Sequence, residues 1–142
     1  MGEKIIVRQN RHFETDILAQ DPHHPEDLTF HSVEAVYHLT PYGMMLSGLG
    51  SCTAIVLHTY AQNHGLPLDE VELHLVYERV FEDDCQECES IQEYREQIVE
   101  TIALTGDLTP EQKQRLFAVS RHCPIHKLMV HGIEIDSRLD AD

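Results

Sequence analysis

The architecture of this 142-residue chain follows from one uncharged run, Thr40-Pro41-Tyr42-Gly43-Met44-Met45-Leu46-Ser47-Gly48-Leu49-Gly50-Ser51-Cys52-Thr53-Ala54. Thr40 can offer its hydroxyl oxygen to unpaired backbone amides at a helix start. Pro41 suits the first helical position, because the amide hydrogen that proline lacks would be unpaired there. We therefore predict a helix that begins at Thr40-Pro41 and ends near His64-Gly65.

Two stripes of side chains run along this predicted helix. The apolar stripe contains Met45, Leu49, Cys52 and Val56, and the stripe of small residues contains Gly43, Ser47, Gly50 and Ala54. A glycine inside a helix costs about 1 kcal/mol relative to alanine, so a close contact must compensate for it. We expect that contact to come from a second helix, with another subunit as one source.

The rest of the chain shows the pattern of an α+β domain. Residues 4–7 and 12–19 should form a hairpin around a turn at 9–11, and 33–39 is ambiguous, with a short strand as one interpretation. We further expect strands at 70–81 and 94–105, a helix opened by a capping box from Thr109 to Gln112, a short helix at 124–130 stopped by Gly132, and a final strand at 133–136. The length fits a single domain, 1–142, with antiparallel strands.

Composition narrows the classes of partner. The formal net charge is −15 with only ten Lys and Arg, so neither nucleic acid nor an anionic membrane surface is an expected partner. The uncharged residues 35–68 are long enough to span a bilayer, but their glycines and prolines favour a buried helix. Met1–Lys4 leads directly into an alternating pattern instead of an apolar signal region, which predicts a cytoplasmic protein. Its four cysteines are then expected to be free, redox-active or metal-bound.

Two of the cysteines lie where a thiol could react. Cys123 immediately precedes Pro124, so a helix beginning there would direct its free amides and its dipole toward the sulfur and favour a thiolate. The alternative is a small buried residue at a helix junction. Cys52 lies in the apolar stripe, where burial raises a thiol pKa, so a reactive Cys52 requires a cation from elsewhere in the fold.

Both cysteines belong to motifs that resemble the osmotically inducible protein C / organic hydroperoxide resistance family. Thr40–Ala54 is similar to its central-helix signature, and the segments Gly106–Gln112 and Cys123–His126 resemble its second signature. The resemblance runs from about Val33 to the end of the chain. It implies an α+β fold in which antiparallel sheets pack around two central helices, in an intertwined homodimer with its sites at the subunit interface.

The resemblance also implies an activity. Cys52 would attack an organic hydroperoxide and become a sulfenic acid, Cys123 would resolve it as a disulfide, and an external dithiol would reduce that disulfide, without a cofactor. Such a thiol peroxidase would act in oxidative stress. The family places an arginine over the reactive thiol, and Arg8 and Arg11 on the N-terminal hairpin are both candidates for it.

The chain departs from the family at one position. Peroxide-reducing members carry a glutamate one or two residues after the Thr/Asn-Pro pair, where this chain has Tyr42 and Gly43. Glu34 or another carboxylate is a candidate substitute. The absence of a glutamate at these two positions predicts that the peroxidase activity is degraded or specialised.

A Cys-x-x-Cys pair, Cys85 and Cys88, lies outside these motifs in an acidic connection. Three interpretations remain open. The first is a pair of incidental loop cysteines. The second is a zinc half-site completed by Cys123 and His126 or by other histidines, and the third is a redox pair poorly activated by its acidic neighbours. A non-enzymatic or zinc-binding module is therefore the alternative function.

Overall fold

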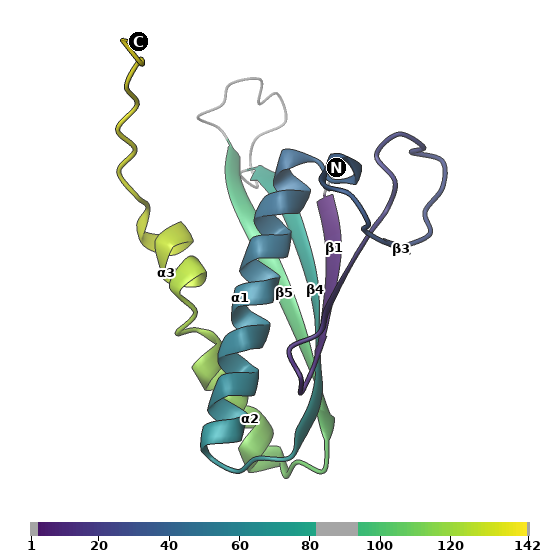
Figure 1. The fold of residues 1–142 in the computed structure, drawn as a ribbon, viewed down its shortest axis with the longest axis vertical. Helices are drawn as coiled ribbons and strands as arrows, with labels where there is room; N and C mark the ends of the chain where they lie inside the picture. The colour runs from purple at the N-terminus through teal and green to yellow at the C-terminus, as the bar shows by residue number, and fades with distance from the viewer. Residues whose placement is uncertain (1–2, 82–93, 142) are drawn as a thin grey trace.

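The computed structural model describes residues 3–81 and 94–141 of the chain and shows a five-stranded sheet with helices packed on one of its faces (Figure 1). The strands are β1 (Glu3–Asn10), β2 (Thr15–Ala19), β3 (His31–Ser32), β4 (Leu68–Phe81) and β5 (Tyr94–Gly106), and the helices are the 3₁₀ helix η1 (Val36–His38), α1 (Pro41–Asn63), α2 (Pro110–Ser120) and α3 (Pro124–His131). The sheet order is β3-β2-β1-β4-β5 and all pairs are antiparallel. The α+β class is confirmed.

Helix α1 is the centre of the fold and begins as predicted. The Thr40 side chain accepts a hydrogen bond of 3.0 Å from the amide of Gly43, and Pro41 occupies the first turn. By length and composition α1 could also cross a membrane, but half of its most apolar window is buried inside this fold. Core helices of soluble domains have the same property.

The stripe of small residues does not pack against a second helix, so that prediction is wrong. Gly50 faces the sheet of its own chain, where a Cβ would lie 2.7 Å from Val7 Cγ2 and 2.9 Å from Leu75 Cδ1. The neighbouring small residues Ser47 and Ala54 are buried on the same side. The missing side chains let α1 lie close to β1 and β4.

The long hairpin of β4 and β5 supplies most of the sheet's apolar face, as the alternating pattern predicts. Val71, Leu73 and Leu75 are wholly buried, and Tyr77 nearly so. The capping box of α2 is also confirmed, because Thr109 accepts a hydrogen bond from the amide of Gln112 while the Gln112 side chain accepts one from the amide of Thr109.

Three local expectations need correction. The N-terminal turn lies at 11–14 instead of 9–11, because the Asn10 side chain accepts hydrogen bonds from the amides of His12 and Glu14. The ambiguous residues 33–39 contain η1 instead of a strand. Gly132 ends α3 as expected, but the predicted final strand at 133–136 does not form, because this segment extends away from the sheet and pairs with none of the described strands (Figure 1).

Candidate functional site

The fold brings Cys52 and Cys123 together. Cys52 lies midway along α1, and α3 packs against α1 with Cys123 as its N-cap residue. Both cysteines are free thiols, and a hydrogen bond joins their side chains. Cys123 is wholly buried and Cys52 is partly exposed. Two sulfur atoms in this arrangement can form a disulfide with little movement, and only Cys52 is open to a reagent from solvent.

The surroundings of Cys52 favour its thiol form. Burial raises the pKa of Cys52 above the ordinary value of 9.0, and the hydrogen bond with Cys123 raises it further. The backbone N–H of Ile125, in the first turn of α3, donates toward Cys52 and opposes both effects. The start of α3 therefore acts on Cys52, which the sequence pattern did not indicate, whereas the side chain of Cys123 forms no capping hydrogen bond there.

A carboxylate completes this side of the site. Glu100 of β5 pairs with Leu75 in the sheet register and so points toward α1, where its Oε1 accepts a hydrogen bond of 3.3 Å from Thr53 Oγ1. Burial raises the pKa of Glu100, while the positive charge of His126 and the hydrogen bond from Thr53 oppose that rise. Sequence reasoning missed this residue, although the signal was visible: Glu100 interrupts the apolar face of an otherwise regular strand.

A pocket adjoins these residues between α1, β5 and α3. Its volume is about 430 Å³, and its lining includes Met45, Leu49, Tyr77, Glu96, Ile98, Glu100, His126, Met129 and Val130. Met45 and Leu49 belong to the same helical stripe as Cys52, and His126 follows Cys123 by three residues. The pocket is therefore lined by near neighbours of both cysteines on α1 and α3, although neither cysteine is part of its lining.

Tyr42, one of the two positions at which the resemblance led us to look for a glutamate, contacts a side chain that lines this pocket. Its ring stacks on that of Tyr77 with centroids 4.6 Å apart. The Tyr77 hydroxyl in turn donates a hydrogen bond of 2.7 Å to Glu96 Oε1. Tyr42, Tyr77 and Glu96 thus form one continuous aromatic and polar contact.

Neither candidate arginine reaches Cys52 within one subunit. The neighbours of Arg8 along β1, Val7 and Gln9, are buried beneath α1. Because successive side chains of a strand point to opposite faces, Arg8 lies on the face of the sheet away from α1, where it forms an ion pair with Glu72. Arg11 forms an ion pair of 3.0 Å with Asp69, and its carbonyl oxygen accepts a hydrogen bond from Gln62 near the end of α1. At about 1.5 Å per helical residue, Gln62 lies about 15 Å along the axis from Cys52.

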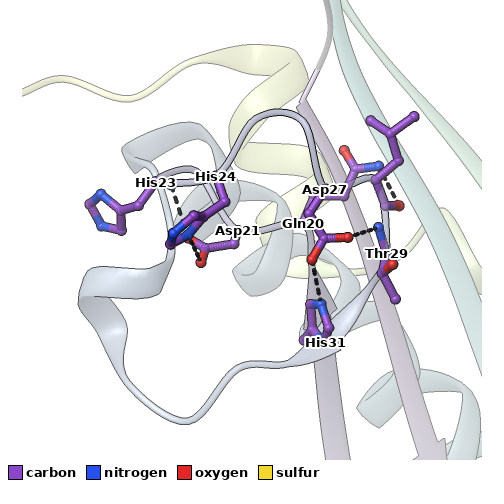
Figure 2. Close-up of polar contacts among 8 residues, drawn as sticks. Gln20, Asp21, His23, His24, Asp27, Thr29 and His31 are labelled. Carbon is purple, nitrogen blue, oxygen red and sulfur yellow. Dashed lines mark hydrogen bonds and ion pairs between the residues drawn. The ribbon is translucent and has the colours of Figure 1, made fainter.

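The proposed metal ligands Cys85 and Cys88 lie outside the described residues. Within residues 3–81 and 94–141, no group of three or more His, Cys, Asp and Glu side chains is arranged to hold a metal. Two histidines instead form pairs with aspartates in the loop between β2 and β3, as Figure 2 shows: His24 pairs with Asp21 at 2.8 Å, and His31 pairs with Asp27 at 3.2 Å. These pairs shape the connection between β2 and β3.

Comparisons with known proteins identify the family of this chain and a solved structure of the same fold. The family model described as "OsmC-like protein" matches residues 34–138, which include both cysteines. The chain belongs to the OsmC-like family. Among solved structures, an OsmC-like hydroperoxide resistance protein from Jannaschia sp. CCS1, determined by crystallography at 1.70 Å, shares the fold with a TM-score of 0.61. That alignment covers 99% of this chain and 94% of the other at 14% identity. No curated protein matches the chain.

Proposed function

We propose that this OsmC-like protein reduces organic hydroperoxides with Cys52 and Cys123. The contact between a partly exposed thiol and a buried one is the observation that supports the proposal, and a pocket lined largely by apolar side chains lies nearby on the same helices. The Jannaschia protein of the same fold is named for hydroperoxide resistance, which points the same way.

The reaction follows from the placement of the sulfurs. Cys52, as thiolate, attacks the distal oxygen of the hydroperoxide, the O–O bond breaks, and the alkoxide takes a proton and leaves as an alcohol. The resulting Cys52 sulfenic acid is attacked by Cys123, a disulfide forms, and water leaves. An external dithiol returns the two electrons and restores both thiols. The buried Cys123 is protected from peroxide, so the order of attack is set by exposure.

The protein is also proposed to act as a cytoplasmic homodimer. Met44, Gly48 and Ile55 leave one face of α1 open, and Met44 and Ile55 are 41% and 47% exposed. The tail beyond α3 exposes Ile133, Ile135 and Leu139. A second subunit would cover such surfaces. It is also the route by which Arg8 or Arg11 would reach Cys52, since within one subunit both are engaged elsewhere.

Mass spectrometry after sub-stoichiometric cumene hydroperoxide tests the function. The wild-type protein should gain a Cys52–Cys123 disulfide, and Cys123→Ser should instead accumulate Cys52 sulfenic acid that a dimedone probe traps. A Cys85→Ser/Cys88→Ser variant is the matched control, because it removes two thiols and keeps the proposed pair. The absence of oxidised Cys52 in every protein would refute the peroxidase proposal. Loss of turnover in Arg8→Gln or Arg11→Gln would identify the arginine.

A further inference from the structure

We propose that Gln62 and His58 of α1 are positioning residues for Arg11, because their hydrogen bonds hold the hairpin turn that carries it. The inference rests on the proposed peroxide chemistry, in which an arginine reaches Cys52 from a second subunit. It adds the residues that fix that arginine in place, and it selects Arg11 over Arg8.

Two side chains of α1 donate hydrogen bonds to backbone carbonyl oxygens of the N-terminal hairpin. Gln62 Nε2 donates to the carbonyl oxygen of Arg11 at 2.8 Å, and His58 Nε2 donates to that of Gln9 at 2.9 Å. His58 precedes Gln62 by four residues, so both side chains leave the helix on the same side. The end of β1 and the start of the turn are therefore attached to one rigid helix.

The bond from His58 lies in the interior. His58 and Gln9 are both buried, so a carbonyl oxygen that lost its donor there would gain no water in exchange. Burial lowers the pKa of His58, and the bond with Gln9 only opposes that change, so the imidazole is uncharged at neutral pH. His58 therefore acts as a fixed link between α1 and β1 and does not add a second cation.

The turn itself has a strained and closely determined shape. Phe13 has a φ of 64°, in the left-handed region that bulky side chains rarely adopt. Its ring meets that of His58 edge to face, with centroids 6.0 Å apart, and the Asn10 side chain accepts hydrogen bonds from the amides of His12 and Glu14. Such a conformation persists only where its surroundings determine it, so these contacts specify one position for the turn.

The ion pair of Arg11 would not fix the arginine by itself. Its guanidinium lies 3.0 Å from Asp69 Oδ1, and the two side chains are 63% and 52% exposed. Exposed ion pairs contribute little to stability, so the guanidinium can exchange this carboxylate for a thiolate while the backbone of the turn stays in place. Asp69 remains close and offsets part of the charge, which limits the effect of Arg11 on any thiolate nearby.

Arg8 has a different environment. It lies on the face of the sheet away from α1 in an ion pair with Glu72, and the negative charges of Glu70 and Asp16 also act on it. A guanidinium that left this face would give up three carboxylates at once. The attachments of the turn to α1 therefore favour Arg11 as the arginine that the structure holds ready.

A double-mutant cycle tests whether Gln62 acts through Arg11. The readout is the rate at which iodoacetamide alkylates Cys52 at pH 7, followed on the Cys52 peptide by mass spectrometry, because a nearby cation raises the thiolate fraction. Arg11→Gln should slow this reaction about tenfold, as a pKa higher by about one unit predicts. Gln62→Met keeps the length of an exposed side chain and removes its donor, and it should slow the reaction by about threefold, since the turn is then only loosened.

The double variant distinguishes positioning from a separate structural effect. If Gln62 acts only through Arg11, Arg11→Gln/Gln62→Met should react as slowly as Arg11→Gln alone, whereas independent effects would multiply to about thirtyfold. Gln114→Met is the matched control, because it makes the same exchange at an exposed position of α2. It should leave the rate unchanged, alone or combined with Arg11→Gln.

A conservative pair of variants tests His58. His58→Gln keeps a side-chain N–H that can donate to the carbonyl oxygen of Gln9, and it should react within about twofold of the wild-type rate. His58→Leu removes the donor and should react about as slowly as Gln62→Met. Circular dichroism and size-exclusion chromatography check that each variant folds and assembles like the wild type. If His58→Leu does not fold, the partial rescue by glutamine and the cycle at Gln62 still decide the matter.

The outcomes separate this inference from the proposed function. The inference is overturned if Gln62→Met or Arg11→Gln reacts like the wild type, if their effects multiply, or if the interdependence appears with Arg8→Gln instead. A His58→Leu protein that reacts at the wild-type rate removes His58 from the set. Alkylation needs no peroxide, so these results hold whether or not cumene hydroperoxide oxidises Cys52, and that oxidation alone decides the peroxidase proposal.

Discussion

Replacing Gly50 by alanine tests how closely α1 lies against the sheet. Alanine should add about 1 kcal/mol of helix stability through propensity alone. The new Cβ, however, would lie 2.7 Å from Val7 Cγ2, 2.9 Å from Leu75 Cδ1 and 3.2 Å from Val7 Cβ. A rotamer change cannot move Val7 Cβ, so β1 or α1 must shift. Overpacking of this kind costs up to about 3 kcal/mol, which leaves a net loss of roughly 1–2 kcal/mol.

Gly48→Ala is the matched comparison. Gly48 lies two positions away on the same helix, and a Cβ there meets nothing within 4 Å in the subunit. This variant should gain up to about 1 kcal/mol, so the two alanine variants should differ by about 2–3 kcal/mol in free energy of unfolding. Urea unfolding followed by circular dichroism, at several protein concentrations, measures both values.

A Gly50→Ala protein as stable as the wild type would refute the close approach of α1 to β1 and β4. A Gly48→Ala protein that is less stable than the wild type at high protein concentration, but not after dilution, would lead to a different conclusion. It would show that a second subunit packs on the exposed face of α1, as the dimer proposal requires.

Three further outcomes can be measured directly. Thr109→Ala should lower the free energy of unfolding by about 1 kcal/mol because it removes the side-chain cap of α2, and Thr109→Ser should retain most of it. The pKa of Asp27 is about 2, below its ordinary 3.8, because its carboxylate accepts hydrogen bonds from the backbone and side chain of Thr29 and from the side chain of His31. The stabilisation that ionised Asp27 gives the loop is therefore complete above pH 3.8 and is lost as the pH falls through about 2. An NMR titration in which the Asp27 carboxyl titrates near 3.8 would contradict this. Cys123→Ala should lower the pKa of Cys52 and speed its alkylation by iodoacetamide at neutral pH, and an unchanged pH profile would argue against the thiol contact.

Elements whose sequence signals are local could be predicted. The cap at Thr40, the capping box at Thr109 and the stop at Gly132 each involve neighbouring residues, and all three form as expected. The alternation from Val71 to Tyr77 likewise reports which face of a strand is buried, whatever covers it. Patterns of this kind need no knowledge of the rest of the fold.

Contacts between distant elements could not be predicted in the same way. Small residues such as Gly50 indicate that another element packs closely against α1, but that element is the sheet and not the expected helix. The sequence of α1 alone does not distinguish these two kinds of contact. Alternation at 133–136 indicates a strand, yet this segment extends away from the sheet and pairs with neither of its edge strands, β3 and β5. The contact of Ile125 with Cys52 and that of Glu100 with Thr53 likewise arise only when α3 and β5 are placed beside α1.

The position of the missing glutamate also has a structural explanation. A side chain at residue 43 would point into the core, where its Cβ would already touch Leu39 and Ile5 at 3.4 and 3.5 Å, so a glutamate there would bury an unpaired carboxylate. Residue 42 is 40% exposed and can hold a large polar or aromatic group. In this chain Tyr42 fills it.

The carboxylate that the structure places beside Thr53, the neighbour of Cys52, is Glu100 on β5. A carboxylate there cannot activate Cys52 by itself, because a negative charge near a thiol disfavours the thiolate. Burial and the neighbouring Cys123 raise the pKa of Cys52, and the N–H of Ile125 offsets only part of that rise. Rapid peroxide reduction at neutral pH therefore requires a cation that one subunit does not supply to this sulfur, which is the strongest physical reason to expect that the working site is assembled from two copies of the chain.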